Sequence, residues 1–166
     1  MRMITTTFIR SLFLTVVANA QWSSDPSNPQ FIGEGIQAQI APTSDGGVYI
    51  AWITDGDYHV YIQRLNLNGE IQFNDSGMLI SDKPNSSWIA INHINLDVDS
   101  EDNAILTTVD QRTGIWEVYA WKISPEGDLV WGEDGIAVTD YGLVNMSPRI
   151  SILADNSVIV TCTQDD

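Results

Sequence analysis

The chain has a single cysteine, Cys162, among its 166 residues. One thiol forms no intramolecular disulfide, and it excludes a metal site built from several cysteines. Basic residues are also scarce, because 7 Lys and Arg face 22 Asp and Glu and leave a formal net charge of −15. An acidic surface repels nucleic acid phosphates and anionic lipid headgroups, so the sequence predicts neither as a partner. Cations and neutral glycans suit such a surface better.

Long apolar runs and helical patterns are missing as well. No stretch approaches the ~18 to 20 consecutive apolar residues of a membrane-spanning helix, so we predict no integral membrane segment. No stretch of useful length repeats its apolar residues with a period of ~3.6, which excludes helical repeats. The hydrophobic content of 43%, with six Trp, nevertheless favours a folded core over disorder.

Residues 1–20 have the features of a secretory signal peptide. They carry two arginines and no acidic residue, a short apolar run over 12–17, and the small-residue sequence Ala-Asn-Ala that ends at Ala20. We therefore predict cleavage near Ala20 and a secreted or cell-surface protein. The alternative is a disordered or strand-forming N-terminus.

Residues 21–36 form a lead-in segment rich in Ser, Asn and Pro. Pro26 and Pro29 oppose regular structure in it, and Trp22 is expected to pack on the domain that follows. Residues 37–166 are different, because turn signals alternate there with short β-branched and aromatic runs. This part of the chain predicts a β-repeat array.

The first unit of the array is clearest between residues 45 and 82. Its predicted strands cover 48–53, 60–65, 71–73 and 78–80. The dipeptide Asn68-Gly69, between the second and the third of them, is a strong hairpin signal. The apolar residues of 48–53 fall on both faces. This pattern is expected of a strand packed between neighbouring sheets.

A second copy of this pattern follows. Residues 60–82 align with residues 118–140 without a gap at an offset of 58. The identical positions of the second copy are Val118, Tyr119, Gly127, Gly135 and Asp140. Upstream, Asp102 aligns with Asp45 at an offset of 57, and Asp155 begins a third copy after another 53 residues.

Repeats of this length, with about four short strands each, are typical of β-propeller blades. We predict an all-β fold of four-stranded antiparallel, propeller-like units over about 37–82, 94–140 and 148–166. The third unit contains its first strands but no returning strand. We therefore expect the chain to be an N-terminal fragment of an incomplete array, with further repeats of the full-length protein as its neighbours.

Three segments resemble the units of large secreted bacterial β-propeller-like repeat proteins exported by the type IX secretion pathway. They are DGGVYIAW at 45–52, VYIQRLNLNG at 60–69 and WGEDGIAV at 131–138. The resemblance covers roughly residues 37–166. It implies cell-surface delivery and a scaffold or adhesive role, and it carries over no catalytic residue. The second unit departs from the pattern with Val109 at the place of Trp52, and the third has Cys162 there.

One acidic stretch is a candidate calcium site. Asp97, Asp99 and Glu101 alternate along the chain, and carboxylate oxygens are preferred calcium ligands. The EF-hand pattern fails, however, because it would need glutamate in place of Thr108 and glycine in place of Asp102. The alternative is a strand that runs into a solvated acidic turn. No other cofactor is predicted.

The remaining candidates have weaker support. The hairpin from Ser124 to Trp131 resembles an Asp box, but the spacing between acid and glycine is one residue short. His59 and His93 lack a metal-ligand spacing, and Cys162 is predicted to be a buried, inert thiol. Aromatic residues in or near turns are candidates either for stacking on sugars or for packing between blades. These are Tyr58, Trp88, Trp116 and Tyr141.

Two hypotheses for function follow from the sequence. The first is a non-enzymatic, secreted or cell-surface propeller-like scaffold for adhesion or ligand binding, with an extracellular glycan or protein as partner. The second is the propeller portion of a secreted carbohydrate-active enzyme whose catalytic residues lie outside this chain. No residue of the chain itself is predicted to be catalytic.

Overall fold

The computed structural model describes residues 25–86, 93–139 and 142–165, and every regular element in these ranges is a β-strand. The predicted signal peptide and Trp22 lie outside the described residues, as do Trp88 and Tyr141. No described residue belongs to a helix that could span a membrane. The strands are β1 (Ile36–Pro42), β2 (Val48–Ile53), β3 (Val60–Leu65), β4 (Met78–Ser81), β5 (Ile94–Val98), β6 (Ala104–Asp110), β7 (Glu117–Ile123), β8 (Ile136–Ala137), β9 (Val144–Ile152) and β10 (Val158–Asp165).

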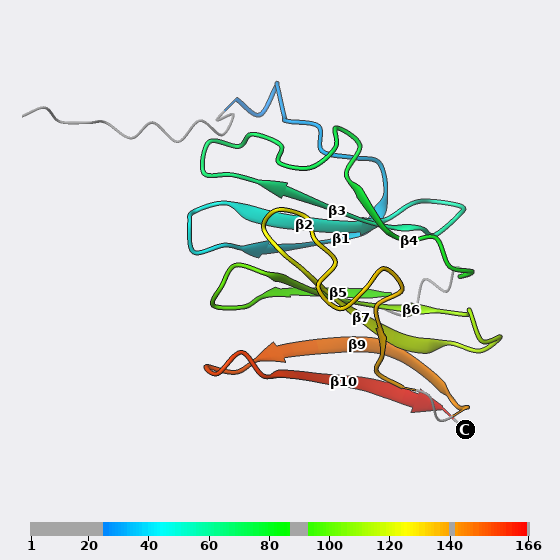
Figure 1. Cartoon of the computed structure of the whole chain (residues 1–166). Helices are drawn as coiled ribbons and strands as arrows, with labels where there is room; N and C mark the ends of the chain where they lie inside the picture. Colours follow the sequence, from blue (N-terminus) through cyan, green and yellow to red (C-terminus); the bar gives the residue numbers. More distant parts are fainter. Residues whose placement is uncertain (1–24, 87–92, 140–141, 166) are drawn as a thin grey trace, which may run out of the picture.

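The strands form three antiparallel sheets that lie one above another in chain order (Figure 1). The first two sheets have the orders β1-β2-β3-β4 and β5-β6-β7-β8, and the third contains β9 and β10. Within each sheet, every strand pairs with the next one along the chain. The predictions of an all-β fold and of four-stranded antiparallel sheets are confirmed. The described strands form an open stack and no closed ring.

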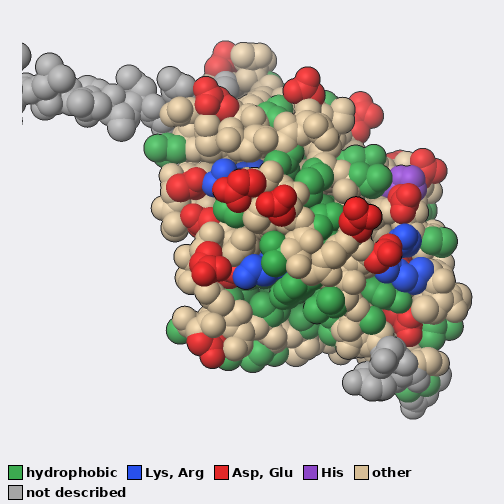
Figure 2. Space-filling view, viewed as in Figure 1, with side chains coloured by type: hydrophobic (Ala, Val, Ile, Leu, Met, Phe, Trp, Pro, Cys, Tyr) green, Lys and Arg blue, Asp and Glu red, His purple; other side chains and the backbone are tan. Residues whose placement is uncertain are grey.

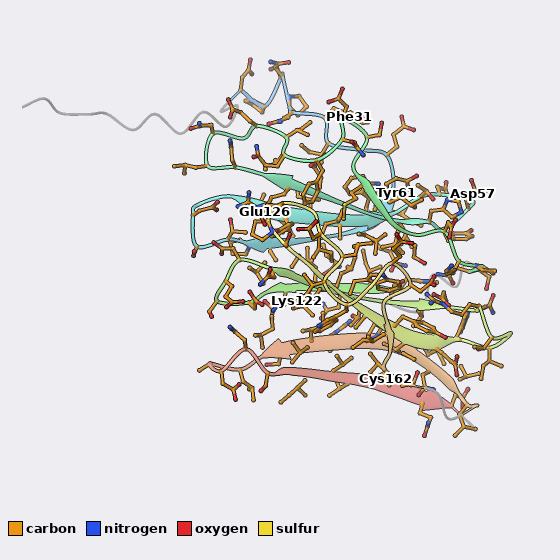
Figure 3. The ribbon with its side chains drawn as sticks, in the orientation of Figure 1. Phe31, Asp57, Tyr61, Lys122, Glu126 and Cys162 are labelled. Carbon is orange, nitrogen blue, oxygen red and sulfur yellow. The ribbon has the colours of Figure 1, made fainter. Side chains whose placement is uncertain are left out.

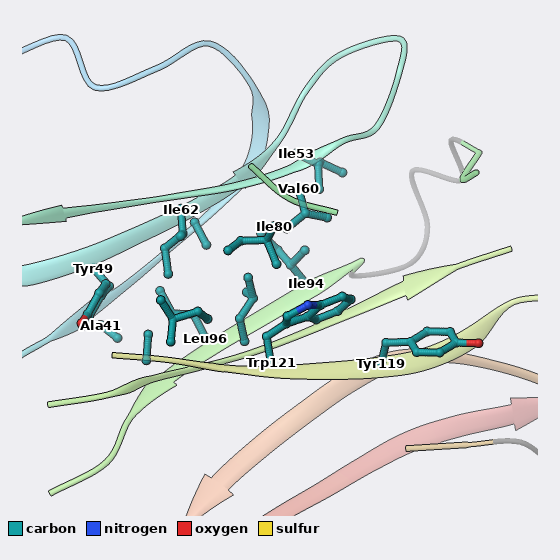
Figure 4. Close-up of a cluster of buried hydrophobic side chains, with 14 residues drawn as sticks. Ala41, Tyr49, Ile53, Val60, Ile62, Ile80, Ile94, Leu96, Tyr119 and Trp121 are labelled. Atoms are coloured by element: carbon teal, nitrogen blue, oxygen red, sulfur yellow. The ribbon is translucent and has the colours of Figure 1, made fainter. Parts of the chain in front are cut away.

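The main hydrophobic core lies between the first and second sheets (Figure 4). Alternation along β2 directs Tyr49, Ala51 and Ile53 into it, and alternation along β7 directs Trp121 and Ile123 into it from the other side. A smaller core, built around Val109, Val118 and Met146, joins the second sheet to the third. Burial of apolar side chains between facing sheets is therefore what holds the stack together.

The first two sheets share turn hydrogen bonds at the predicted offset of 58. Gly69 donates its backbone N–H to Asn66, and Gly127 donates to Ser124. Both glycines have positive φ angles, of 78° and 94°. The alignment of residues 60–82 with 118–140 thus joins positions with the same local geometry.

The upstream alignment at an offset of 57 is wrong by one residue. Gly46, Asp102 and Asn156 have φ angles of 86°, 62° and 64°. Each donates its backbone N–H to the residue three positions earlier, which is Thr43, Asp99 or Leu153. Asp102 therefore corresponds to Gly46 rather than to Asp45, because Asp and Asn tolerate the left-handed conformation that glycine adopts in the first turn. Thr108, not Val109, consequently stands at the place of Trp52.

Candidate functional site

The outer face of the first sheet carries an aromatic hollow. Its volume is about 380 Å³, and its lining comprises Phe31, Gly33, Glu34, Trp52, Thr54, Tyr61, Asp75 and Ser76. The rings of Trp52 on β2 and Tyr61 on β3 stack with centroids 6.0 Å apart and an interplanar angle of 14°. They meet because the pairing of β2 with β3 sets the two residues directly opposite each other.

The lead-in segment forms the rim of this hollow. A Cβ atom added at Gly33 would lie 2.4 Å from Cζ2 of Trp52, and one added at Gly35 would lie 2.3 Å from Cδ1. Only glycine lets the backbone rest this closely on the indole. Trp52 is consequently 5% exposed, whereas Phe31 is 68% exposed above the sheet (Figure 3). The aromatic surface available to a ligand is therefore that of Phe31 and Tyr61.

The polar groups of the hollow suit a neutral, hydroxyl-rich ligand. Glu34 and Asp75 supply carboxylates, and Thr54 and Ser76 supply hydroxyls, around the aromatic wall. Aromatic faces pack against apolar C–H surface, and carboxylates accept hydrogen bonds from hydroxyl groups. The sequence alone did not identify this site. Alternation predicts that Trp52 and Tyr61 share a face, but not that this face is the outermost one of the described stack.

A second polar cluster lies at the end of β6 and the start of β7. Asp110 is 2% exposed and accepts two hydrogen bonds from the Arg112 guanidinium, from Nε at 3.0 Å and from Nη2 at 2.7 Å. Glu117 accepts hydrogen bonds from Thr113 at 2.7 Å and from the Tyr119 hydroxyl at 3.1 Å. Arg112 also lies over the Tyr119 ring, with Cζ 3.6 Å from the centroid.

The chemistry of this cluster is that of a structural network. Burial, with the neighbouring Glu117 carboxylate, raises the pKa of Tyr119 to about 12, so its hydroxyl keeps its proton near neutral pH. A protonated phenol is a weak nucleophile. Asp110 is already bound to Arg112, and Glu117 already accepts from two hydroxyls. The contacts of this cluster therefore join the end of β6 to the start of β7.

Two of the three predicted calcium ligands lie beside a lysine. Nζ of Lys122 lies 2.8 Å from Asp99 and 3.9 Å from Glu101 (Figure 3 labels Lys122). Asp99 also accepts hydrogen bonds from the Asn103 side chain, and Asp97 accepts from the backbone of Val98. Within the described ranges, no group of three or more His, Cys, Asp or Glu residues is placed to hold a metal ion. Calcium binding by this triplet stays a prediction.

The contacts of Asp99 make the stability of the folded protein depend on pH in the acid range. Burial acts to raise the pKa of Asp99, but hydrogen bonds from Lys122, from Asn103 and from the backbone of Glu101 outweigh it and lower the pKa below 3.8. Folding thus favours the ionised form. Its contribution is complete above the ordinary pKa and is lost as pH falls through the folded value.

We expect Asp99→Asn to flatten the acid-side fall in the free energy of unfolding. Lys122→Met should also reduce that fall, because without its pKa-lowering partner the folded pKa of Asp99 moves closer to the ordinary value of 3.8. A group contributes pH dependence only where its folded and unfolded pKa values differ. Urea unfolding over about pH 2 to 6 measures both effects. An acid limb that is the same in wild type and both variants would contradict the assigned role of the ion pair.

The other sequence candidates lie in packing positions. Cys162 is half-buried, not buried as predicted, because it packs only against the margin of the core between the second and third sheets. This partial burial raises the pKa of its thiol. His93 is buried, and its ring lies edge-on to that of Trp116, with the two ring centroids 6.3 Å apart. Tyr58 packs against the main core. In the hairpin of the Asp-box resemblance, the Ser124 hydroxyl accepts from the backbone of Asp128, which closes a turn.

Comparison with known proteins adds no further information on identity. The chain matches no protein-family model, no curated protein and no solved structure. The resemblance to repeat proteins of the type IX secretion pathway therefore stays a prediction.

Proposed function

We propose that this chain is a secreted or cell-surface, non-enzymatic scaffold of β-propeller-like units that binds an extracellular glycan or protein. The observation that carries the scaffold is one hydrogen bond that recurs between successive sheets. The backbone N–H of Ser44 donates to Asp102 Oδ1 at 2.6 Å, and the backbone N–H of Ser100 donates to Asn156 Oδ1 at 3.1 Å. The donors are equivalent turn positions, and so are the acceptors.

Amide side chains of β1 and β5 also reach the next sheet, although at different register positions. Gln37 accepts a hydrogen bond from the backbone of His93 at 2.9 Å, and Asn95 accepts one from the backbone of Ile150 at 2.7 Å. The counterpart of Asn95 by strand register is Gln39, so only the turn hydrogen bond recurs at equivalent positions. A recurring contact of that kind is what a repeat array requires, because each unit buries its faces only against its neighbours.

The aromatic hollow supports glycan binding at one end of the stack. Phe31 and Tyr61 offer ring surface, and Glu34 and Asp75 offer acceptors for sugar hydroxyls. The acidic surface of the protein favours neutral sugars over anionic ones. Acidic side chains are spread over much of the visible face in Figure 2.

We expect Phe31→Ala and Tyr61→Ala each to weaken glycan binding about three- to tenfold, the loss expected for one aromatic contact. The measurement is a screen of neutral oligosaccharides on the full chain, followed by calorimetric titration of the best ligand. Leu67→Ala is the control, because Leu67 is 58% exposed and lies outside the hollow. Equal affinities for wild type and both hollow variants would overturn this assignment.

The enzyme hypothesis requires catalytic groups beyond the described residues. The acidic side chains at the β6–β7 end are engaged by Arg112, Thr113 and Tyr119. The scaffold is accordingly the function that the described residues support best.

A further inference from the structure

An apolar groove lies between the second and third sheets. Its volume is about 390 Å³, and Figure 2 shows hydrophobic side chains gathered below the middle of the molecule, at the level of this junction. The groove is lined by β7, by β8 and the chain on both sides of it, and by β10 with the turn that precedes it. The lining residues are Ala120, Trp131, Ile136, Ala137, Val138, Asn156, Val158 and Val160.

At the junction of the first and second sheets, the space that corresponds to this groove is filled by side chains of the main core. Six of the eight positions that correspond to the groove residues there lie in the main core or pack against it. They are Ile62, Phe73, Met78, Ile80, Ala104 and Leu106. The space beside them contains β7, which pairs with β6 and brings Trp121 into the core. Among the described strands, β10 pairs with β9 alone, so its other edge lacks the counterpart of β7.

The register of the first two sheets defines what that counterpart would carry. Tyr49 of β2 faces Arg64, and Ile105 of β6 faces Lys122. In the first sheet, Arg64 lies 2.5 Å from Asp45 of the preceding turn. In the second, Lys122 lies 3.9 Å from Glu101, the counterpart of Asp45, and 2.8 Å from Asp99, two residues earlier in the same turn. In both sheets, therefore, the third strand carries a basic residue opposite the same position of the second strand, which is Tyr49 or Ile105.

The third sheet has the acid without the cation. Asp155 corresponds to Asp45, and its carboxylate accepts from the backbone N–H of Ser157 at 3.0 Å. In the part of the chain that the structure describes, no lysine or arginine lies within ion-pair distance of Asp155. A strand beside β10 would place a cation near this carboxylate from the position opposite Ile159.

The sizes of the side chains on the second and third strands indicate that this added strand carries a tryptophan next to its basic residue. In the first sheet the large residue is Trp52 on the second strand, and Gln63 lies on the third. In the second sheet Thr108 is the small residue on the second strand, and Trp121 lies on the third, opposite Leu106. In the third sheet Cys162 stands at the place of Trp52, so the matching arrangement has the indole on the missing strand, opposite Val160.

We propose that the free edge of β10 and this groove receive an antiparallel β-strand that carries a lysine or arginine opposite Ile159 and a tryptophan opposite Val160. Its main chain would continue the ladder of the third sheet, and its tryptophan would fill the groove. The inference rests on the proposed array, since it uses the equivalence of the three sheets, and it adds the chemistry of the partner.

A peptide of residues 115–125, which contains β7, is the probe for this site. Added to the full chain, it is expected to bind saturably in fluorescence anisotropy and to slow amide exchange across residues 158–165. Exchange in β1 and β6 should not change. A peptide with proline in place of Ala120 cannot complete the ladder and is expected not to bind.

A charge exchange tests the proposed register. The peptide with Lys122→Glu should bind about threefold more weakly, as expected for one partly exposed ion pair. The chain with Asp155→Lys should bind this changed peptide better than the original one. Absence of binding, or binding that leaves β10 unprotected, would overturn the proposal. So would self-association of the chain that protects β10, because a second copy would then be the occupant. The glycan site lies at the other end of the stack, so its titration is independent of these results.

Discussion

Trp121→Ala is expected to lower the free energy of unfolding by about 3–5 kcal/mol, the range for truncating a buried aromatic residue. Trp121 is 1% exposed between the first and second sheets. Its indole N–H donates to the backbone of Glu133 at 3.1 Å, and a Cβ atom at Gly135 would lie 2.6 Å from its ring. The residues packed around Trp121 cannot fully close the space that an alanine leaves. The cost of the remaining cavity therefore adds to the free energy lost with the buried apolar surface.

Urea unfolding of the full chain measures this effect as a lower midpoint at an unchanged slope. Trp131→Ala is the matched control. Trp131 is partly exposed beside the groove, so its loss should cost less than about 1 kcal/mol. Similar losses for the two tryptophans would contradict the placement of Trp121 in the main core.

Arg112→Met is expected to destabilise the protein by about 3–5 kcal/mol, because it leaves the buried Asp110 carboxylate without its cation. Arg112 bonds both oxygens of Asp110, stacks on Tyr119 and donates to the backbone of Asp134 at 2.9 Å. The same unfolding assay applies. The double variant Asp110→Asn, Arg112→Met should recover part of the loss, since an uncharged amide costs less to bury than an unpaired carboxylate.

Lys83→Met is the control for this ion pair. Lys83 lies 2.7 Å from Asp134, but the side chains are 35% and 72% exposed. Solvent screens this pair, so its loss should lower the free energy of unfolding far less than the loss of Arg112. Equal losses for the lysine and arginine variants would show that burial of Asp110 is not what makes its pairing important.

Local patterns explain which predictions from the sequence succeeded. The strands over 48–53 and 60–65 were predicted from runs of β-branched and aromatic residues, and β2 and β3 cover the same ranges. The hairpin after β3 followed from Asn68-Gly69, because a tight turn needs residues that accept positive φ. The same tolerance explains the error upstream. Asp102 adopts the conformation of a turn glycine, so matching Asp102 with Asp45 by residue type displaced the alignment by one position.

The calcium candidates show what residue spacing leaves out. Asp97, Asp99 and Glu101 were selected by their alternation along the chain. The cation beside two of them belongs to β7, and it arrives there because β6 pairs with β7 in a register that sets Ile105 opposite Lys122. Pairing between strands depends on the whole sheet, which spacing within a single segment does not encode.

The sequence by itself determined the β-strands, the turns between them and the order of strands within each sheet, because alternation and turn conformations are properties of neighbouring residues. Only the tertiary structure decided which face of each sheet meets which neighbour. β6 is buried along its whole length, so its side chains have no polar face that would indicate an outside. The aromatic hollow and the groove beside β10 became visible only once the sheets were stacked, because each lies where one sheet's apolar face is not covered by the next.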